Sequence, residues 1–221
     1  MDSQFLTSLP IWIAAFVLAS TVHEFAHGWV AYKLGDKTAL YAGRLTLNPI
    51  SHIDPAGIIV LIVLLASSGG RFGFGWAKPV PFNPMNLRNP KMGTGLIALA
   101  GPVSNLVLVT IFALLAKAFE SSILSNIGVA KFFGIFILFN IILAGFNMIP
   151  IPPLDGSKVL FSLLPGKLAW GFLKFERYGF LFLVVLMVTP LGNYIIPMFI
   201  RPIISAVLTI FNLPTQIMTS L

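Results

Sequence analysis

Long apolar runs are the feature that most constrains how this chain can fold. Residues 11–34, 94–116, 132–149 and 178–200 are each long enough to cross a hydrocarbon core, which takes about 20 helical residues. Hydrophobic residues fill 57% of the 221 positions and charged residues only 10%, against roughly 25% charged residues in soluble domains. The sequence therefore predicts an all-α polytopic membrane protein.

No polar segment between these runs is long enough to fold as a separate soluble module, so we expect one integral-membrane domain over residues 1–221. The apolar amino-terminal stretch has no basic region ahead of it. We therefore expect a retained span there and not a cleaved signal peptide.

Two segments between the first and second spans do not fit a simple crossing. The apolar run 58–66 is short, which favours a re-entrant segment. In residues 71–76, Phe72, Phe74 and Trp76 alternate with Arg71 and two glycines. This period of two predicts a membrane-associated extended strand or β-hairpin.

The basic residues predict the topology. Eleven of the 14 Lys and Arg residues lie in segments 33–54, 69–94 and 156–177, and cytoplasmic loops retain an excess of positive charge. We therefore place these segments on the cytoplasmic side of a cell membrane, with Lys117, Lys131 and Arg201 outside. Because the basic residues are dispersed between apolar runs, the net charge of +7 does not indicate nucleic-acid binding.

The first span contains His23-Glu24-Phe25-Ala26-His27. Two histidines four residues apart lie on one face of a helix, so both imidazoles can reach one zinc ion while Glu24 reaches a water molecule beside it. The chain has no cysteine, which leaves His and carboxylates as the metal-binding side chains. The alternative is a set of buried polar groups that joins helices or conducts protons.

Asp155 is the predicted third ligand, because it follows Pro150, Pro152 and Pro153 at the end of an apolar run. Irregular backbone at membrane depth is tolerated where it is buried or lines a wet cavity. His27 precedes the cytoplasmic end of its span by six residues, about 9 Å. Asp155 also lies near the cytoplasmic end of its apolar run, so the two residues are expected at similar depths in the membrane. An ordinary helix-terminal turn remains an alternative for Asp155, and Asp54 is the reserve ligand.

Three motifs in this order carry a resemblance to a known family: H-E-F-A-H at 23–27, G-P-V-S-N at 101–105 and N-M-I-P-I-P-P-L-D-G at 147–156. The chain resembles the site-2 proteases, which are intramembrane zinc metalloproteases, in a minimal bacterial form without PDZ or CBS domains. The resemblance implies a three-helix catalytic core over 11–34, 94–116 and 132–156.

The resemblance also implies roles for individual residues. It implies one catalytic Zn²⁺ held by His23, His27 and Asp155, with Glu24 activating water. Asn147 matches the family's asparagine and would donate to the oxyanion, although a helix-packing hydrogen bond is the alternative.

Other polar residues have weaker predictions. Asn140 has a lesser claim to the donor role, and Gly101 and Asn105 are expected to serve close helix packing. His52 is either a proton donor at the site or a loop residue that fixes a turn.

The predicted function is zinc-dependent hydrolysis of peptide bonds in or near transmembrane segments of membrane-protein substrates, as in regulated intramembrane proteolysis. The predicted location is the bacterial cytoplasmic membrane, with the active site near its cytoplasmic side. An extended substrate would need an edge, which segment 71–76 or 39–47 could supply by strand addition. The alternatives are a metal-binding transporter, which would place more ionisable residues in the other spans, and a non-proteolytic membrane chaperone, which would lack a ligand or Glu24.

Overall fold

A computed structural model describes residues 3–69 and 73–213, and within these ranges helices are the only regular secondary structure. The α-helices are α1 (Ser3–Lys33), α2 (Thr38–Tyr41), α3 (Pro55–Ser67), α4 (Pro90–Ala118), α5 (Glu120–Leu124), α6 (Ile127–Asn147), α7 (Asp155–Leu163), α8 (Gly166–Glu176), α9 (Gly179–Val188) and α10 (Gly192–Phe211). Two 3₁₀ turns, η1 (Pro49–Ser51) and η2 (Pro84–Asn86), lie between them.

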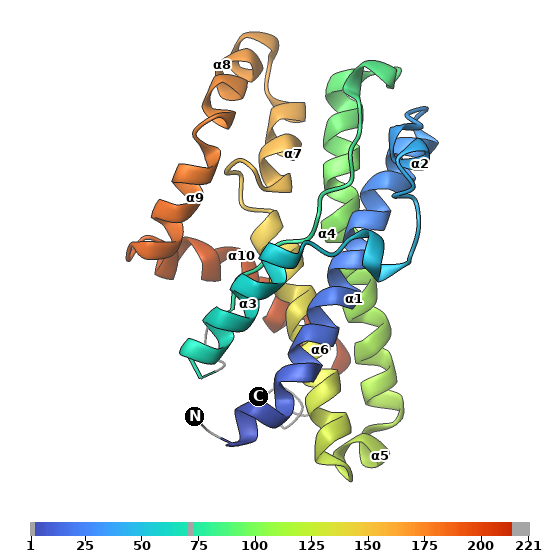
Figure 1. Cartoon of the computed structure of the whole chain (residues 1–221), viewed down its shortest axis with the longest axis vertical. Coiled ribbons are helices and arrows are strands. Elements are labelled where there is room, and N and C mark those ends of the chain that lie inside the picture. Colours follow the sequence, from blue (N-terminus) through green and yellow to red (C-terminus); the bar gives the residue numbers. More distant parts are fainter. Residues whose placement is uncertain (1–2, 70–72, 214–221) are drawn as a thin grey trace.

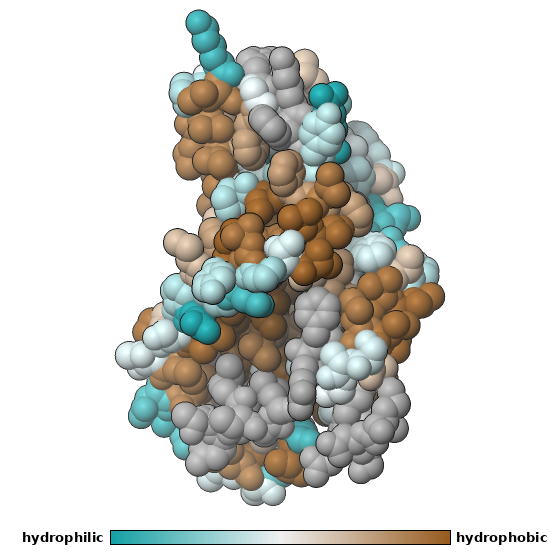
Figure 2. All heavy atoms as spheres, turned by 90° about the vertical axis from the view of Figure 1, so that its left-hand side faces the viewer, coloured by the Kyte–Doolittle hydropathy of each residue, from teal (hydrophilic) through white to brown (hydrophobic). Residues whose placement is uncertain are grey.

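The long helices α1, α4 and α6 pack pairwise along the vertical axis of Figure 1, and α7 packs against α4. The Ser8–Lys33 part of α1, and α4, α6 and α10, are each long and apolar enough to cross a membrane. The prediction of an all-helical, polytopic membrane protein is confirmed. Hydrophobic residues cover much of the face shown in Figure 2, as expected of a surface in contact with lipid.

The predicted strand at 71–76 is wrong for the residues that the structure describes; Arg71 and Phe72 lie outside them. From Gly73 to Asn83 the chain has no regular secondary structure and runs as an extended trace between α3 and α4 (Figure 1). A Cβ atom on Gly75 would lie 2.7 Å from the Gly57 carbonyl oxygen on α3, while the Phe74 ring lies 6.3 Å from the Phe146 ring on α6. The alternation thus reflects one face pressed against a helix and another facing aromatic rings.

The expected short segment at 56–68 is helix α3. Its 13 residues give a length of about 20 Å, less than the roughly 30 Å hydrocarbon core. The Asp54 side chain begins the helix by accepting hydrogen bonds from the N–H groups of Ala56 and Gly57.

The carboxyl-terminal spans differ from the prediction. The single span expected at 178–200 is two helices, α9 and α10, separated at Thr189, Pro190 and Leu191. Proline has no N–H and restricts the residue before it, so α9 ends there although the composition stays apolar. Arg201, expected in an outside loop, lies in the middle of α10.

Two chain reversals position the polar residues of interest. Gly35, at φ +106°, ends α1: its N–H donates to the Tyr32 carbonyl, and the Asp36 N–H donates to the Ala31 carbonyl. Beyond α6, residues 148–154 are irregular, and Asp155 is the first residue of α7. A Cβ atom at Gly156 would lie 2.3 Å from the Met148 carbonyl oxygen, so only glycine allows this fold-back.

We predict that Gly57→Ala destabilises the protein, because its Cβ atom would lie 2.0 Å from the Trp76 carbonyl oxygen. Two backbone segments must then move apart, at a cost of about 1–3 kcal/mol. Thermal unfolding in detergent measures the effect. Gly166→Ala is the matched control, since no described atom lies within 4 Å of its added Cβ. Equal unfolding temperatures for the two variants would contradict this packing.

Candidate metal centre

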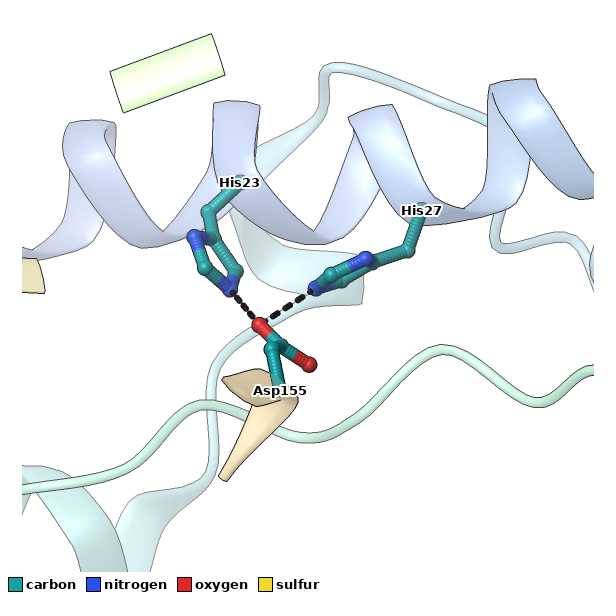
Figure 3. Close-up of side chains that lie close together, drawn as sticks. All are labelled: His23, His27 and Asp155. Atoms are coloured by element: carbon teal, nitrogen blue, oxygen red, sulfur yellow. Dashed lines mark hydrogen bonds and ion pairs between the residues drawn. The ribbon is translucent and has the colours of Figure 1, made fainter. Parts of the chain in front are cut away.

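Three side chains from two distant parts of the chain converge on one another. His23 and His27 project from the same side of α1, and Asp155 reaches them from the first turn of α7 (Figure 3). The Asp155 Oδ2 atom lies 3.1 Å from His23 Nε2 and 3.3 Å from His27 Nε2. All three residues are buried, and their potential ligand atoms lie within 4.8 Å of one another.

A backbone carbonyl on α4 fixes the orientation of His27. His27 Nδ1 lies 2.7 Å from the Ile97 carbonyl oxygen. A carbonyl oxygen can only accept, so Nδ1 carries the proton and donates. The lone pair of neutral His27 is therefore on Nε2, the atom that faces Asp155.

Two asparagines fix His23 in the same way. Asn105 Nδ2 donates to the Ala19 carbonyl at 3.2 Å and to Asn140 Oδ1 at 2.9 Å, which leaves Asn105 Oδ1 to accept from His23 Nδ1 at 2.6 Å. His23 Nε2 thus also presents a lone pair. From the sequence, Asn105 is expected to serve helix packing, and its place in the G-P-V-S-N motif is the one signal of a role at the site.

The converging atoms fit a cation. Two imidazole lone pairs and a carboxylate oxygen are all acceptors, so a cation or added protons must lie between them. Two histidines and one carboxylate match the three-ligand set of catalytic zinc sites, which leave a fourth position for water or substrate. The hydrogen bonds from both Nδ1 atoms are the supporting contacts that metal-ligating histidines usually make.

Gly101 of α4 lies against both imidazoles. A Cβ atom there would lie 2.5 Å from Nε2 of His23 and 2.5 Å from Nε2 of His27. Such a Cβ would occupy the space next to the converging atoms. Gly101 therefore serves close packing, as expected, and what it packs against is the pair of histidine side chains on α1.

Glu24 faces a different neighbour. Its Oε2 accepts a hydrogen bond of 2.8 Å from the Val80 backbone N–H. Val80 belongs to the extended segment 76–83, which we call the arm. Glu24 is therefore oriented by the backbone of a segment more than fifty residues away in the sequence.

The remaining predicted residues form hydrogen bonds with groups other than the three converging side chains. Asn147 Nδ2 donates to the Leu143 carbonyl of its own helix at 3.0 Å. His52 is buried, with Nε2 2.8 Å from the Thr46 carbonyl oxygen, a contact suited to a loop residue. The reserve ligand Asp54 is engaged at the start of α3.

Comparison with known proteins identifies relatives of the chain. Residues 116–190 match the model of peptidase family M50. The chain is 41% identical over 196 residues to "Putative zinc metalloprotease YwhC" of Bacillus subtilis, with 86% of each chain covered. It is 33% identical over 184 residues to "Putative zinc metalloprotease Rip2" of Mycolicibacterium smegmatis, covering 82% of this chain and 68% of the relative. No solved structure matches. The motifs, the convergent acceptor atoms and these relatives together show that the chain belongs to peptidase family M50, the site-2 protease family, and is a zinc metalloprotease.

Proposed function

We propose that this zinc metalloprotease is an intramembrane endopeptidase that hydrolyses peptide bonds in or near transmembrane segments of other membrane proteins. The observation that carries the proposal is the position of the convergent group. His23 and His27 lie within the part of α1 that is long and apolar enough to span a membrane, and both are buried among other apolar helices.

We assign the zinc ligands to His23 Nε2, His27 Nε2 and Asp155 Oδ2. Bound zinc supplies Lewis acidity, which polarises the scissile carbonyl group and makes a water molecule more acidic. Ile97 and Asn105 keep both imidazoles in the tautomer that this role needs.

Glu24 is assigned as the proton carrier. It accepts a proton from the attacking water and delivers it to the leaving amine. Val80 N–H occupies Oε2, so Oε1 is the oxygen available for this transfer. Asn147 is assigned as the oxyanion donor, because its amide has two N–H bonds and Leu143 takes only one of them.

We place the site near the cytoplasmic face of the bacterial cytoplasmic membrane. Lys33 ends α1, and Lys91 and Lys158 lie in the first turns of α4 and α7. Lys117, in contrast, lies at the far end of α4. The charge asymmetry holds with Arg201 placed inside α10, and it supports a short aqueous path to the site.

The substrates that suit such a site are transmembrane segments, as in regulated intramembrane proteolysis. A helical segment already satisfies its own carbonyl groups, so it must unwind locally before attack. Extended backbone near the site can then receive it.

We predict that Glu24→Gln lowers the cleavage rate of a single-span transmembrane reporter by at least about 10²-fold, because the proton carrier is lost. Zinc content should stay at the wild-type value. The glutamine carbonyl can still accept from Val80 N–H, which keeps the local structure. The measurements are reporter cleavage and metal analysis of the purified protein, and wild-type cleavage by the variant would refute the assignment.

Asp155→Ala should remove most of the bound zinc, because two neutral imidazoles remain without the anionic ligand. Metal analysis after dialysis against a weak chelator checks this. Asp54→Ala is the matched carboxylate control: it should keep its zinc while losing about 1 kcal/mol of stability with the cap of α3. Full zinc occupancy in Asp155→Ala would require another third ligand.

Gly101→Ala should weaken zinc binding by about 10-fold or more, because its Cβ displaces the two imidazole Nε2 atoms. Competition with a fluorescent zinc chelator measures the affinity. Gly166→Ala again serves as the control. An unchanged zinc affinity would contradict the close contact between Gly101 and the two imidazoles.

A further inference from the structure

The arm, residues 76–83, has an unusual relation to Glu24. It is extended and belongs to no sheet, yet its Val80 N–H donates to Glu24 Oε2 at 2.8 Å. The Val80 side chain is buried against α1 at Gly28, where an added Cβ would lie 3.2 Å from Val80 Cγ1. The arm thus meets α1 with both a backbone hydrogen bond and a side-chain contact, one helical turn apart.

Each end of the arm is held by polar groups of other segments. At one end, Lys78 N–H donates to the His52 carbonyl at 2.9 Å, and the buried Arg44 guanidinium donates to the Lys78 carbonyl. At the other end, Asn83 N–H donates to Asp36 Oδ2 at 2.7 Å. Val80 lies between these attachments, so they determine where its N–H points.

Asp36 is the one charged acceptor in these attachments, and it is completely buried. Besides Asn83 N–H, it accepts at Oδ1 from Asn86 Nδ2, Thr38 N–H and the Thr38 hydroxyl. Burial raises the pKa of Asp36, but these four hydrogen bonds outweigh it and hold the pKa below its ordinary value. The carboxylate is therefore ionised at neutral pH, where charge-assisted hydrogen bonds are stronger than neutral ones.

We propose that Asp36 is a positioning residue for catalysis, which holds the arm so that Val80 N–H fixes one oxygen of Glu24 and leaves the other aimed for proton transfer. This inference rests on the proposed role of Glu24 as the proton carrier. A carboxylate held at one oxygen loses the freedom to rotate, and a loss of alignment of about 1 Å costs on the order of 10²-fold in rate.

A second contact ties the arm to the opposite side of the site. The Lys158 ammonium group lies 5.8 Å from the centroid of the Phe82 ring and 4.0 Å from Asp155 Oδ1. The arm therefore contacts residues of both α1 and α7, the two helices that supply the converging side chains. A shift of the arm would move Glu24 first, because the arm backbone bonds directly to the Glu24 carboxylate.

Asp36→Asn tests the proposal selectively. An amide has one acceptor oxygen, and this oxygen will face the three donors at the Oδ1 position. The amide NH₂ then faces Asn83 N–H, so the attachment of the arm is the bond that breaks. Thr38→Val is the matched control, since it removes a donor to the same carboxylate and leaves the Asn83 bond in place.

With purified full-length protein, zinc and a single-span transmembrane reporter, Asp36→Asn should lower kcat by about 10-fold or more. KM should stay within about threefold and zinc content should be unchanged. Hydrogen–deuterium exchange should show faster exchange of the Val80 amide. Thr38→Val should lower the unfolding temperature with kcat within about twofold of wild type.

Val80→Pro removes the donor itself, and Pro79 and Pro81 on either side already hold the chain extended. It should lower kcat as Asp36→Asn does, and the double variant should be no slower than Val80→Pro alone, because both act through one hydrogen bond. A higher kcat in Val80→Pro would show that the contact is inhibitory and would overturn the proposal. So would additive losses, or unchanged Val80 exchange in Asp36→Asn. A wild-type protein that binds zinc but cleaves no reporter would instead overturn the proposed function, and the positioning role with it.

Discussion

Three acceptor atoms brought together inside an apolar bundle are the arrangement on which the rest of the structure depends. The lone pairs of His23 Nε2 and His27 Nε2 face the Asp155 carboxylate, and the three groups repel one another without a cation or protons between them. Other residues must therefore hold these side chains in place through hydrogen bonds and packing. Helix α4 provides much of it, through the Ile97 carbonyl and Asn105, so this helix orients both imidazoles without supplying a converging side chain.

Small residues make this support sterically possible. Gly101 lets α4 reach the imidazoles, and Gly156 lets the chain after α6 fold back on Met148 so that Asp155 begins α7 next to α1. Gly57 and Gly75 let the extended segment pass directly over α3. In each case backbone or a functional side chain occupies the space that a Cβ would need, so these glycines serve close approach and not flexibility.

Hydrogen bonds from segments outside the bundle support Glu24 in a similar way. A membrane-embedded carboxylate without a partner is costly, and Val80 N–H provides a partner from segment 76–83. Because that segment is extended, its orientation depends on attachments to the loops after α1 and before α3. The buried Asp36 carboxylate, placed by the reversal at Gly35, makes one of these attachments through a charge-assisted hydrogen bond.

The sequence by itself determined the membrane setting, the helical class and the ligand candidates, since apolar length, the His23–His27 spacing and the Pro-rich approach to Asp155 are local properties. It overstated the strand at 71–76, because a period of two reports two different faces whether the partner is a sheet or a helix. The sequence predicted one span where the structure has α9 and α10, because the apolar composition continues across Pro190. Only the tertiary structure decided that Asn105 orients His23, that Gly101 touches both histidines, and that Val80 bonds Glu24. These contacts join residues 82, 78 and 56 positions apart, and no local pattern encodes which distant groups the packing of helices will bring within hydrogen-bonding distance.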